Sequence, residues 1–158
     1  MAAMPLLAIL LNVVGLVPFI VCGLAALGTD QVTAERTLNA LIDYAAVTLA
    51  FAGGVHWGFE LHAPPQDAFV QRARLGLALL APLVAWLALL LPLVAAPWVA
   101  LIVLIAAYIG AVLVEQQAAR RNLLPAGYLW LRWAFTVVVV AMMVTVLTLR
   151  LLGQTIAF

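Results

Sequence analysis

The stretch Leu77–Leu91, LALLAPLVAWLALLL, is apolar from end to end, and so is Val137–Val144, VVVVAMMV. A helix needs about 20 apolar residues to cross a hydrocarbon core about 30 Å thick. Backbone polar groups in lipid must pair within their own segment, which a helix achieves, whereas the strands of a membrane barrel alternate apolar and polar residues. The two runs therefore predict membrane-spanning helices and not strands.

The composition places much of the chain against lipid. Of its 158 residues, 68% are hydrophobic and 8% are charged, whereas a soluble domain is about 45–50% apolar and about 25% charged. A soluble fold cannot hide such an excess in its interior, so the remainder must face hydrocarbon. We therefore expect an all-α integral membrane protein.

Working outward from the two runs, helix-end signals delimit five predicted spans. Gly28 suits the C-cap of the first helix, Thr33 suits the N-cap of the second, and Pro92 follows the third. Pro18 and Pro82 lie inside spans, where proline tends to kink a helix. The expected bundle is a single transmembrane domain of residues 1–158 with spans at about 5–27, 38–59, 74–91, 97–117 and 129–152.

The distribution of arginine predicts the orientation of the bundle. An odd number of spans puts the two termini on opposite sides of the membrane. The N-terminal side then carries Arg72, Arg74, Arg120, Arg121 and Arg132, and the other side carries Arg36 and Arg150. Because short arginine-rich loops stay in the cytoplasm, we expect a cytoplasmic N-terminus and a C-terminus across the membrane.

Several common classes of function are disfavoured by what the sequence lacks. The formal net charge is +1, and no run of basic residues is long enough to contact successive phosphates of a nucleic acid. We therefore expect no nucleic-acid partner. The chain has no serine, no His-Glu-x-x-His and no phosphate-binding loop, the patterns of common hydrolases and nucleotide-binding enzymes. Cys22 is the single cysteine, which excludes an intrachain disulfide. We expect neither a cofactor nor a metal ion.

A ladder of small residues marks the second predicted span. Small side chains at this spacing share one helix face and let another helix backbone approach closely. The ladder serves either packing within the bundle, which is the commoner use, or a dimer seam or ligand slot. Its members recur every four residues: Ala46, Ala50, Gly54 and Gly58.

Asp43 lies about one turn inside the apolar part of the second span. A carboxylate in hydrocarbon is costly, so an acid inside a span is a candidate functional residue by default. The structural alternative is that Asp43 reaches the headgroups or pairs with Arg36 or Arg150, which lie on the same predicted side. Both interpretations stay open from the sequence.

His56 and Glu60 are four residues apart and share a helix face at the cytoplasmic end of the second span. They suggest a polar ligand site or a proton relay. They would also be half of a metal site, which needs three or four ligands. Glu115 and Gln116 at the same predicted membrane side could complete it, although nothing in the spacing requires it. The structural alternative is a helix-end cluster anchored at the interface by Trp57 and neutralised by Arg74 or Arg132.

Glu115 and Arg132 both lie just inside the predicted cytoplasmic ends of their spans. An ion pair between them would neutralise two charges that are costly near hydrocarbon. Both residues lie on the predicted membrane side at which His56 lies. We therefore expect Glu115, Arg132 and His56 to contribute to one polar site. The hydroxyls of the span threonines are expected to bond to their own helix backbone: Thr48, Thr136, Thr145 and Thr148.

Several segments resemble the signatures of one known family. They are Gly15–Phe19 (GLVPF), Tyr44, Phe51–Gly58 (FAGGVHWG), Pro82 with Ala85-Trp86, and Leu124-Pro125 with Tyr128 and Leu131-Arg132. The chain thus resembles the domain of unknown function 3429 family, which includes animal transmembrane protein 69. The resemblance implies a five-span protein of bacterial or mitochondrial membranes, here the bacterial inner membrane with a periplasmic C-terminus. It adds Tyr44 to the candidate binding residues and implies no activity; Glu115 stands where the family pattern leads us to expect Asp.

Three classes of function remain. We favour a non-catalytic membrane factor that binds a partner protein or a lipid-like small molecule. The alternatives are a small solute or proton-coupled carrier that uses Asp43, and a membrane enzyme that uses His56 and Glu60 as acid and base. The expected partners are the lipid bilayer and a membrane protein or a second copy of the chain.

Overall fold

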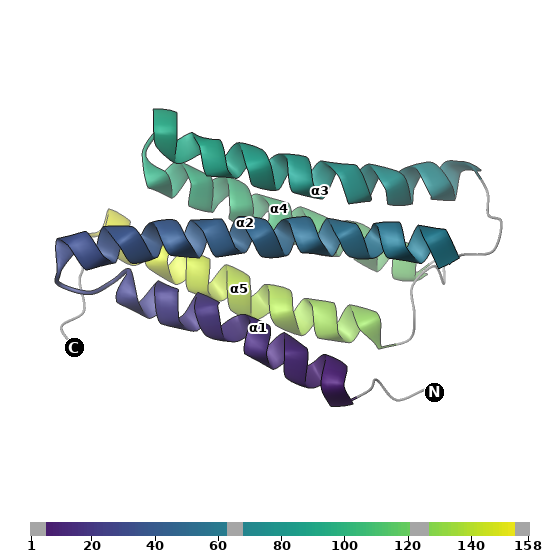
Figure 1. The fold of residues 1–158 in the computed structure, drawn as a ribbon, viewed down its shortest axis with the longest axis horizontal. Helices are drawn as coiled ribbons and strands as arrows, with labels where there is room; N and C mark the ends of the chain where they lie inside the picture. Colours follow the sequence, from purple (N-terminus) through teal and green to yellow (C-terminus); the bar gives the residue numbers. More distant parts are fainter. Residues whose placement is uncertain (1–5, 63–67, 121–126, 154–158) are drawn as a thin grey trace. The chain divides into compact units, whose positions relative to one another are not determined.

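Within the described residues, 6–62, 68–120 and 127–153, the chain of the computed structural model forms five helices and no strand. This confirms the predicted all-α fold. The helices, drawn in Figure 1, are α1 (Leu6–Ala25), α2 (Gln31–His62), α3 (Ala68–Val94), α4 (Pro97–Arg120) and α5 (Tyr128–Leu151).

Four of the helices, α1, α2, α4 and α5, are long and apolar enough to cross a membrane. The described part of α3 contains a shorter apolar helix, Ala78–Val94. Large apolar side chains also cover the surface of the spans: Leu7, Leu11 and Val14 of α1 are 66%, 62% and 64% exposed. Such surfaces need lipid around them, because water would make this exposure costly.

The first turn of α2 is capped by an acidic residue. The backbone N–H of Thr33 donates to Asp30 Oδ2 at 3.0 Å, so Asp30 is the N-cap and α2 begins at Gln31. The prediction that Thr33 is the cap was therefore wrong, because Thr33 is the residue whose N–H the cap satisfies. Hydrogen bonds from the side chain and backbone of Thr33 hold the pKa of Asp30 below its usual value.

The end of α3 also differs from the sequence prediction. Pro92 lies inside α3, which continues to Val94, so the prediction that the helix ends at Leu91 was wrong. Pro92 removes only one backbone donor. The helix continues because the next turn still closes, with Ala95 N donating to Leu91 O at 2.8 Å. The connection to α4 is correspondingly short.

The contacts of the chain divide it into two compact units, which are described separately. Unit 1 comprises Met1–Leu41 and Tyr108–Phe158, and unit 2 comprises Ile42–Ala107. Unit 1 thus contains α1, the start of α2, the end of α4 and α5. Unit 2 contains the remainder of α2, all of α3 and the start of α4.

In unit 1, α1 packs directly on α5. Phe19 is fully buried and contacts the rings of Tyr108 and Phe135 edge-on, with centroids 6.5 and 5.9 Å away. Gly23 is also buried, and a Cβ added to it would collide with Met142. A small residue on α1 thus lets the two helices approach closely.

A long side chain ties the last turn of α5 to the hairpin between α1 and α2. Arg150 Nη1 donates to the carbonyl oxygens of Ala26 at 3.0 Å and Ala34 at 3.3 Å. Basic groups near a helix C-terminus commonly satisfy such carbonyls. Arg150 therefore stabilises this end of unit 1.

In unit 2, the backbones of α2 and α3 nearly touch at Gly53. A Cβ on Gly53 would lie 3.0 Å from Ala81 Cβ and from Pro82 Cδ, and 3.1 Å from the carbonyl oxygen of Ala78. The buried residues around this contact are mostly small: Ala45, Ala46, Ala52, Ala78, Ala85 and Ala88. Small residues that permit close helix contact are typical of packing inside membranes.

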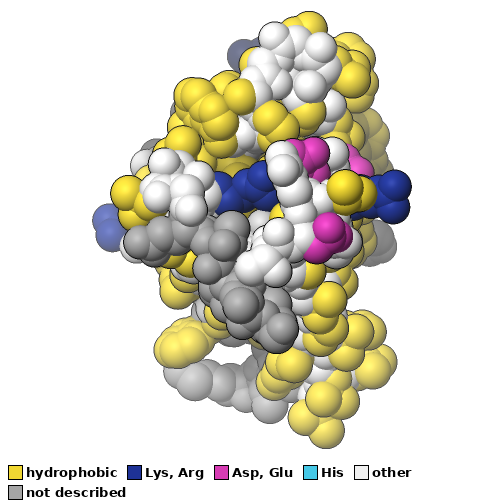
Figure 2. Space-filling model, turned by 90° about the vertical axis from the view of Figure 1, so that its left-hand side faces the viewer, with side chains coloured by type: hydrophobic (Ala, Val, Ile, Leu, Met, Phe, Trp, Pro, Cys, Tyr) yellow, Lys and Arg dark blue, Asp and Glu magenta, His cyan; other side chains and the backbone are white. Residues whose placement is uncertain are grey.

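The surface carries few charges. In the space-filling view of one face, a few acidic and basic side chains lie among uncharged atoms, many of them hydrophobic (Figure 2). This pattern agrees with the low charged fraction of the sequence, 8%. Charged groups that lie inside the fold, described next, are therefore exceptional.

Candidate functional site

Glu115 of α4 and Arg132 of α5 form a buried ion pair in unit 1. Arg132 Nε donates to both carboxylate oxygens of Glu115, at 2.9 Å to Oε2 and 3.2 Å to Oε1. The two side chains are only 1% and 8% exposed. This confirms the ion pair that we predicted from the depth of the two residues.

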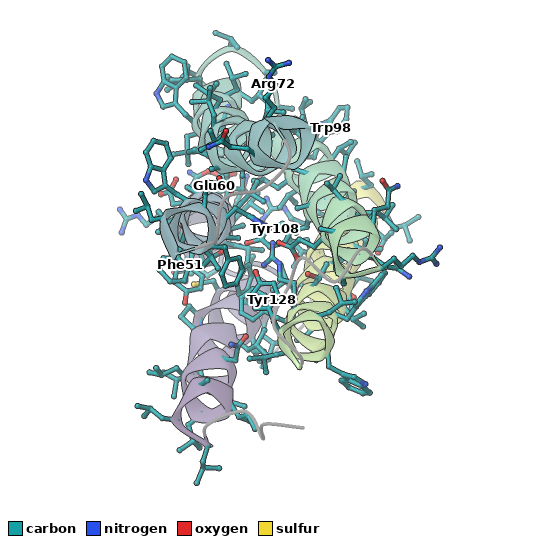
Figure 3. The ribbon with its side chains drawn as sticks, turned by 90° about the vertical axis from the view of Figure 1, so that its right-hand side faces the viewer. Phe51, Glu60, Arg72, Trp98, Tyr108 and Tyr128 are labelled. Atoms are coloured by element: carbon teal, nitrogen blue, oxygen red, sulfur yellow. The ribbon has the colours of Figure 1, made fainter. Side chains whose placement is uncertain are left out.

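Two tyrosines complete the surroundings of the pair, and both of them, Tyr108 and Tyr128, are labelled in Figure 3. The guanidinium carbon of Arg132 lies 5.9 Å from the ring centroid of Tyr108, which is fully buried, so the ring face attracts the cation. Tyr128, one turn before Arg132, hydrogen-bonds to Glu115 through its hydroxyl. The carboxylate and the guanidinium are thus each held by two neighbours.

Two buried polar atoms of α5 lack a hydrogen-bond partner among the described residues: Arg132 Nη2 and Thr136 Oγ1. Thr136 is 2% exposed and lies one turn deeper along α5 than Arg132. Buried polar atoms without partners are rare in proteins and call for an explanation such as a water or ligand. We call Tyr108, Glu115, Tyr128, Arg132 and Thr136 the polar cluster.

Thr136 differs from the other span threonines. The hydroxyls of Thr48, Thr145 and Thr148 donate to backbone carbonyls of their own helix, at 2.8–2.9 Å four residues back, as predicted. For Thr136 the prediction was wrong, because its hydroxyl makes no such bond within the described residues. A hydroxyl that donates to its own backbone has no donor to spare, whereas that of Thr136 has.

The remaining cytoplasmic-end candidates belong to unit 2. His56 is 2% exposed and packs edge-on against Phe59, with ring centroids 6.1 Å apart. Trp57 is exposed, in keeping with an interfacial anchor. Glu60, labelled in Figure 3, is half-buried. The side chain of Arg74, a proposed neutralising partner, lies outside the described side chains.

No group of three His, Cys, Asp or Glu side chains positioned to hold a metal ion occurs among the described residues. His56 and Glu60 come from unit 2, whereas Glu115 and Arg132 come from unit 1. The convergence of all four side chains on one site stays a prediction.

Asp43 is exposed, and Tyr44 beside it is half-buried. Within the described residues Asp43 makes no hydrogen bond or ion pair, and Arg150 instead donates to backbone carbonyls. Asp43 belongs to unit 2, whereas Arg36 and Arg150 belong to unit 1, so the pairing offered above as an alternative stays a prediction.

The ladder of small residues runs from the inside of unit 2 to its surface. Ala46 is buried and Ala50 is half-buried, but Gly54 and Gly58 are exposed, with nothing within 4 Å of an added Cβ. The close helix contact occurs instead at Gly53. Residues spaced strictly four apart drift around a helix that has 3.6 residues per turn. The predicted ladder therefore does not include Gly53, where the close contact lies. The use of Gly54 and Gly58 as a contact stays a prediction.

Tyr108, Tyr128 and Thr136 are the members of the polar cluster that the sequence did not identify as site residues, and Tyr128 was noted only as part of the family resemblance. Tyr108 is seven residues, or about two helical turns, before Glu115, and this spacing on an apolar helix was the only available signal. Nothing in the sequence distinguishes Thr136 from the other threonines. Its role follows from the burial of its hydroxyl.

Comparison with known proteins supports the resemblance noted in the sequence. The model of one family, described as a protein of unknown function (DUF3429), matches residues 4–148. Neither the curated proteins nor the solved structures give a match. Because the family model covers nearly the whole helical bundle, from α1 to the last turns of α5, the chain belongs to the DUF3429 family.

Proposed function

We propose that this chain is a non-catalytic membrane factor that binds a lipid-like small molecule at the polar cluster. The observation that carries the proposal is the buried guanidinium of Arg132, whose Nη2 has no hydrogen-bond partner among the described residues. A ligand oxygen that accepts from this nitrogen would remove the cost of burying it unpaired. Catalysis is not required by this arrangement.

The energetics of the ion pair support a role beyond folding. Taking two charges out of water is costly, and apolar side chains of similar volume often stabilise a protein equally well. A buried Glu115–Arg132 pair therefore adds little to stability by itself. It does keep a guanidinium charged and oriented at a depth where few hydrogen-bond donors are available.

The charges of the polar cluster indicate the chemistry of the ligand. Glu115 already neutralises Arg132, so an anion would bring an uncompensated charge into a region of low dielectric constant. The donors that remain are the Nη2 N–H of Arg132 and the hydroxyl of Thr136. A neutral, largely apolar molecule with an oxygen acceptor fits both conditions.

We also propose that all five helices cross the bacterial inner membrane, with the N-terminus in the cytoplasm. The proposal requires α3 to span with α1, α2, α4 and α5. It is supported by the arginines, since more of them fall on the N-terminal side than on the other. The polar cluster then lies near the cytoplasmic surface.

The ligand is tested by native mass spectrometry of the full chain released from nanodiscs of its host lipids. We expect the wild type to retain a bound molecule of defined mass, and Arg132→Gln and Thr136→Val to lose it. Thr136→Val keeps the ion pair and the side-chain shape, so its result stands even where Arg132→Gln does not fold. The matched controls are Arg72→Gln and Thr145→Val, because both side chains are exposed. An empty wild type, or equal retention by all four variants, would contradict the proposal.

A further inference from the structure

Asp43 lies on an exposed face of α2 that carries Arg36 two turns nearer the N-terminus and no charge in the two turns after Asp43. Residues that follow it on this face by helical periodicity are Val47, Gly54 and Gly58, all of them exposed. Asp43 itself makes no hydrogen bond or ion pair with a described residue of unit 2. We call these four residues the Asp43 face.

The position of Asp43 along α2 puts its carboxylate within the hydrocarbon. The helix runs from Gln31 to His62, and 1.5 Å per residue places Asp43 about 18 Å from its first residue and about 28 Å from its last. Asp43 would lie outside a hydrocarbon core about 30 Å thick only if that core covered all residues from Tyr44 to His62. Glu60 would then lie inside the core. A core that starts near Leu38 includes Asp43 and leaves Glu60 near the opposite interface.

A carboxylate exposed at that depth requires a covering group of opposite charge. Lipid tails offer no donor, and ionisable groups inside membranes pair with one another or with polar backbone. A second copy of this chain inserts in the same orientation and brings its own Asp43 to the same depth. The two carboxylates would then repel each other, which argues against a homodimer through this face.

We propose that the Asp43 face docks a transmembrane helix of a different protein, one that places a basic side chain at the depth of Asp43. Charge complementarity selects the partner: no described cation of unit 2 pairs with Asp43, and an arginine or lysine in a membrane helix needs an acid as its partner. Gly54 and Gly58 leave open space where side chains would stand, so the partner backbone can approach α2 beyond the ion pair. This interface is independent of the ligand proposed for the polar cluster.

The proposal is tested with two synthetic transmembrane helices of leucine and alanine. One carries a single arginine at the depth of Asp43, and the other carries leucine there. Binding to the full chain in lipid bilayers is measured by energy transfer between labelled helix and labelled protein. We expect the arginine helix to bind at least tenfold more tightly than the leucine helix, and Asp43→Asn to abolish the difference.

Two further variants separate the interface from general effects of charge and folding. Asp30→Asn removes an exposed carboxylate outside the span and keeps a good N-cap, so it should retain the preference for the arginine helix. Gly54→Leu should weaken binding of both helices several-fold, because it fills the open space. Equal binding of both helices to the wild type, or a preference that survives Asp43→Asn, would overturn the proposal. If the wild-type chain associates with itself and Asp43→Asn abolishes this association, the proposal is overturned, because the Asp43 face would then bind a second copy of this chain.

Discussion

At the scale of single residues, the chain retains one buried ion pair whose two charges come from different helices. Glu115 is held by Arg132 and Tyr128, and Arg132 is held by Glu115 and by the ring of Tyr108. Each partner therefore protects the other from being a lone buried charge. The pair was predictable from depth, whereas the spare donors of Arg132 and Thr136 depend on side-chain directions that no sequence pattern encodes.

Removing one member of the pair should destabilise the protein more than removing both. Arg132→Leu and Glu115→Leu each leave a buried charge unpaired, so each should lower the free energy of unfolding by about 3–5 kcal/mol. The double variant leaves no charge and should recover most of this loss. Unfolding in detergent, measured for the wild type and the three variants, tests the cycle. Additive losses would mean that the pair is not coupled.

The N-cap of α2 makes a pH-dependent contribution. The pKa of Asp30 is held below its ordinary value of 3.8 by hydrogen bonds from Thr33. The ionised carboxylate therefore stabilises the first turn fully above pH 3.8, and this stabilisation is lost as the pH falls through the lowered pKa. Hydrogen exchange at the amide of Thr33 should accelerate in that acidic range, beyond the intrinsic pH dependence. In Asp30→Asn the extra acceleration should be absent, and its persistence would contradict the assignment of the cap.

At the scale of helices, the two units rely on close contacts at glycine. Gly23 brings α1 against Met142 of α5 in unit 1, and Gly53 brings α2 against α3 in unit 2. The existence and type of all five helices could be predicted, because long apolar runs in lipid leave the backbone no other way to pair. The ends of α2 and α3 could not, since they depend on which side chain caps and on how far a helix continues beyond a proline.

Adjacent glycines of α2 provide a matched test of this contact. A Cβ at Gly53 would meet the carbonyl oxygen of Ala78 at 3.1 Å and the ring of Pro82 at 3.0 Å, groups that cannot move aside easily. Gly53→Ala should therefore cost about 1–3 kcal/mol, as overpacked cores do. Gly54→Ala meets nothing within 4 Å and should be neutral or slightly stabilising, because alanine favours helices. Equal thermal stability of the two variants would show that α2 and α3 do not touch here.

At the scale of the whole molecule, an apolar surface and a few isolated polar groups define what the chain can do. Membrane location followed from composition, and family membership followed from short motifs such as Phe51–Gly58. The exposure of Asp43 on α2 was beyond the sequence, which offered Arg36 and Arg150 as equally plausible partners. Arg150 donates to the carbonyl oxygens of Ala26 and Ala34 within unit 1, and a pairing of Asp43 with either arginine stays a prediction.

The most direct test concerns the number of membrane crossings. In a Cys22→Ala background, one cysteine is added at either terminus and labelled in intact cells with a thiol reagent that does not cross the inner membrane. Five crossings predict that the C-terminal cysteine reacts from outside and that the N-terminal cysteine reacts only after the membrane is opened. Reaction of both cysteines from the same side would mean an even number of crossings and would contradict the account.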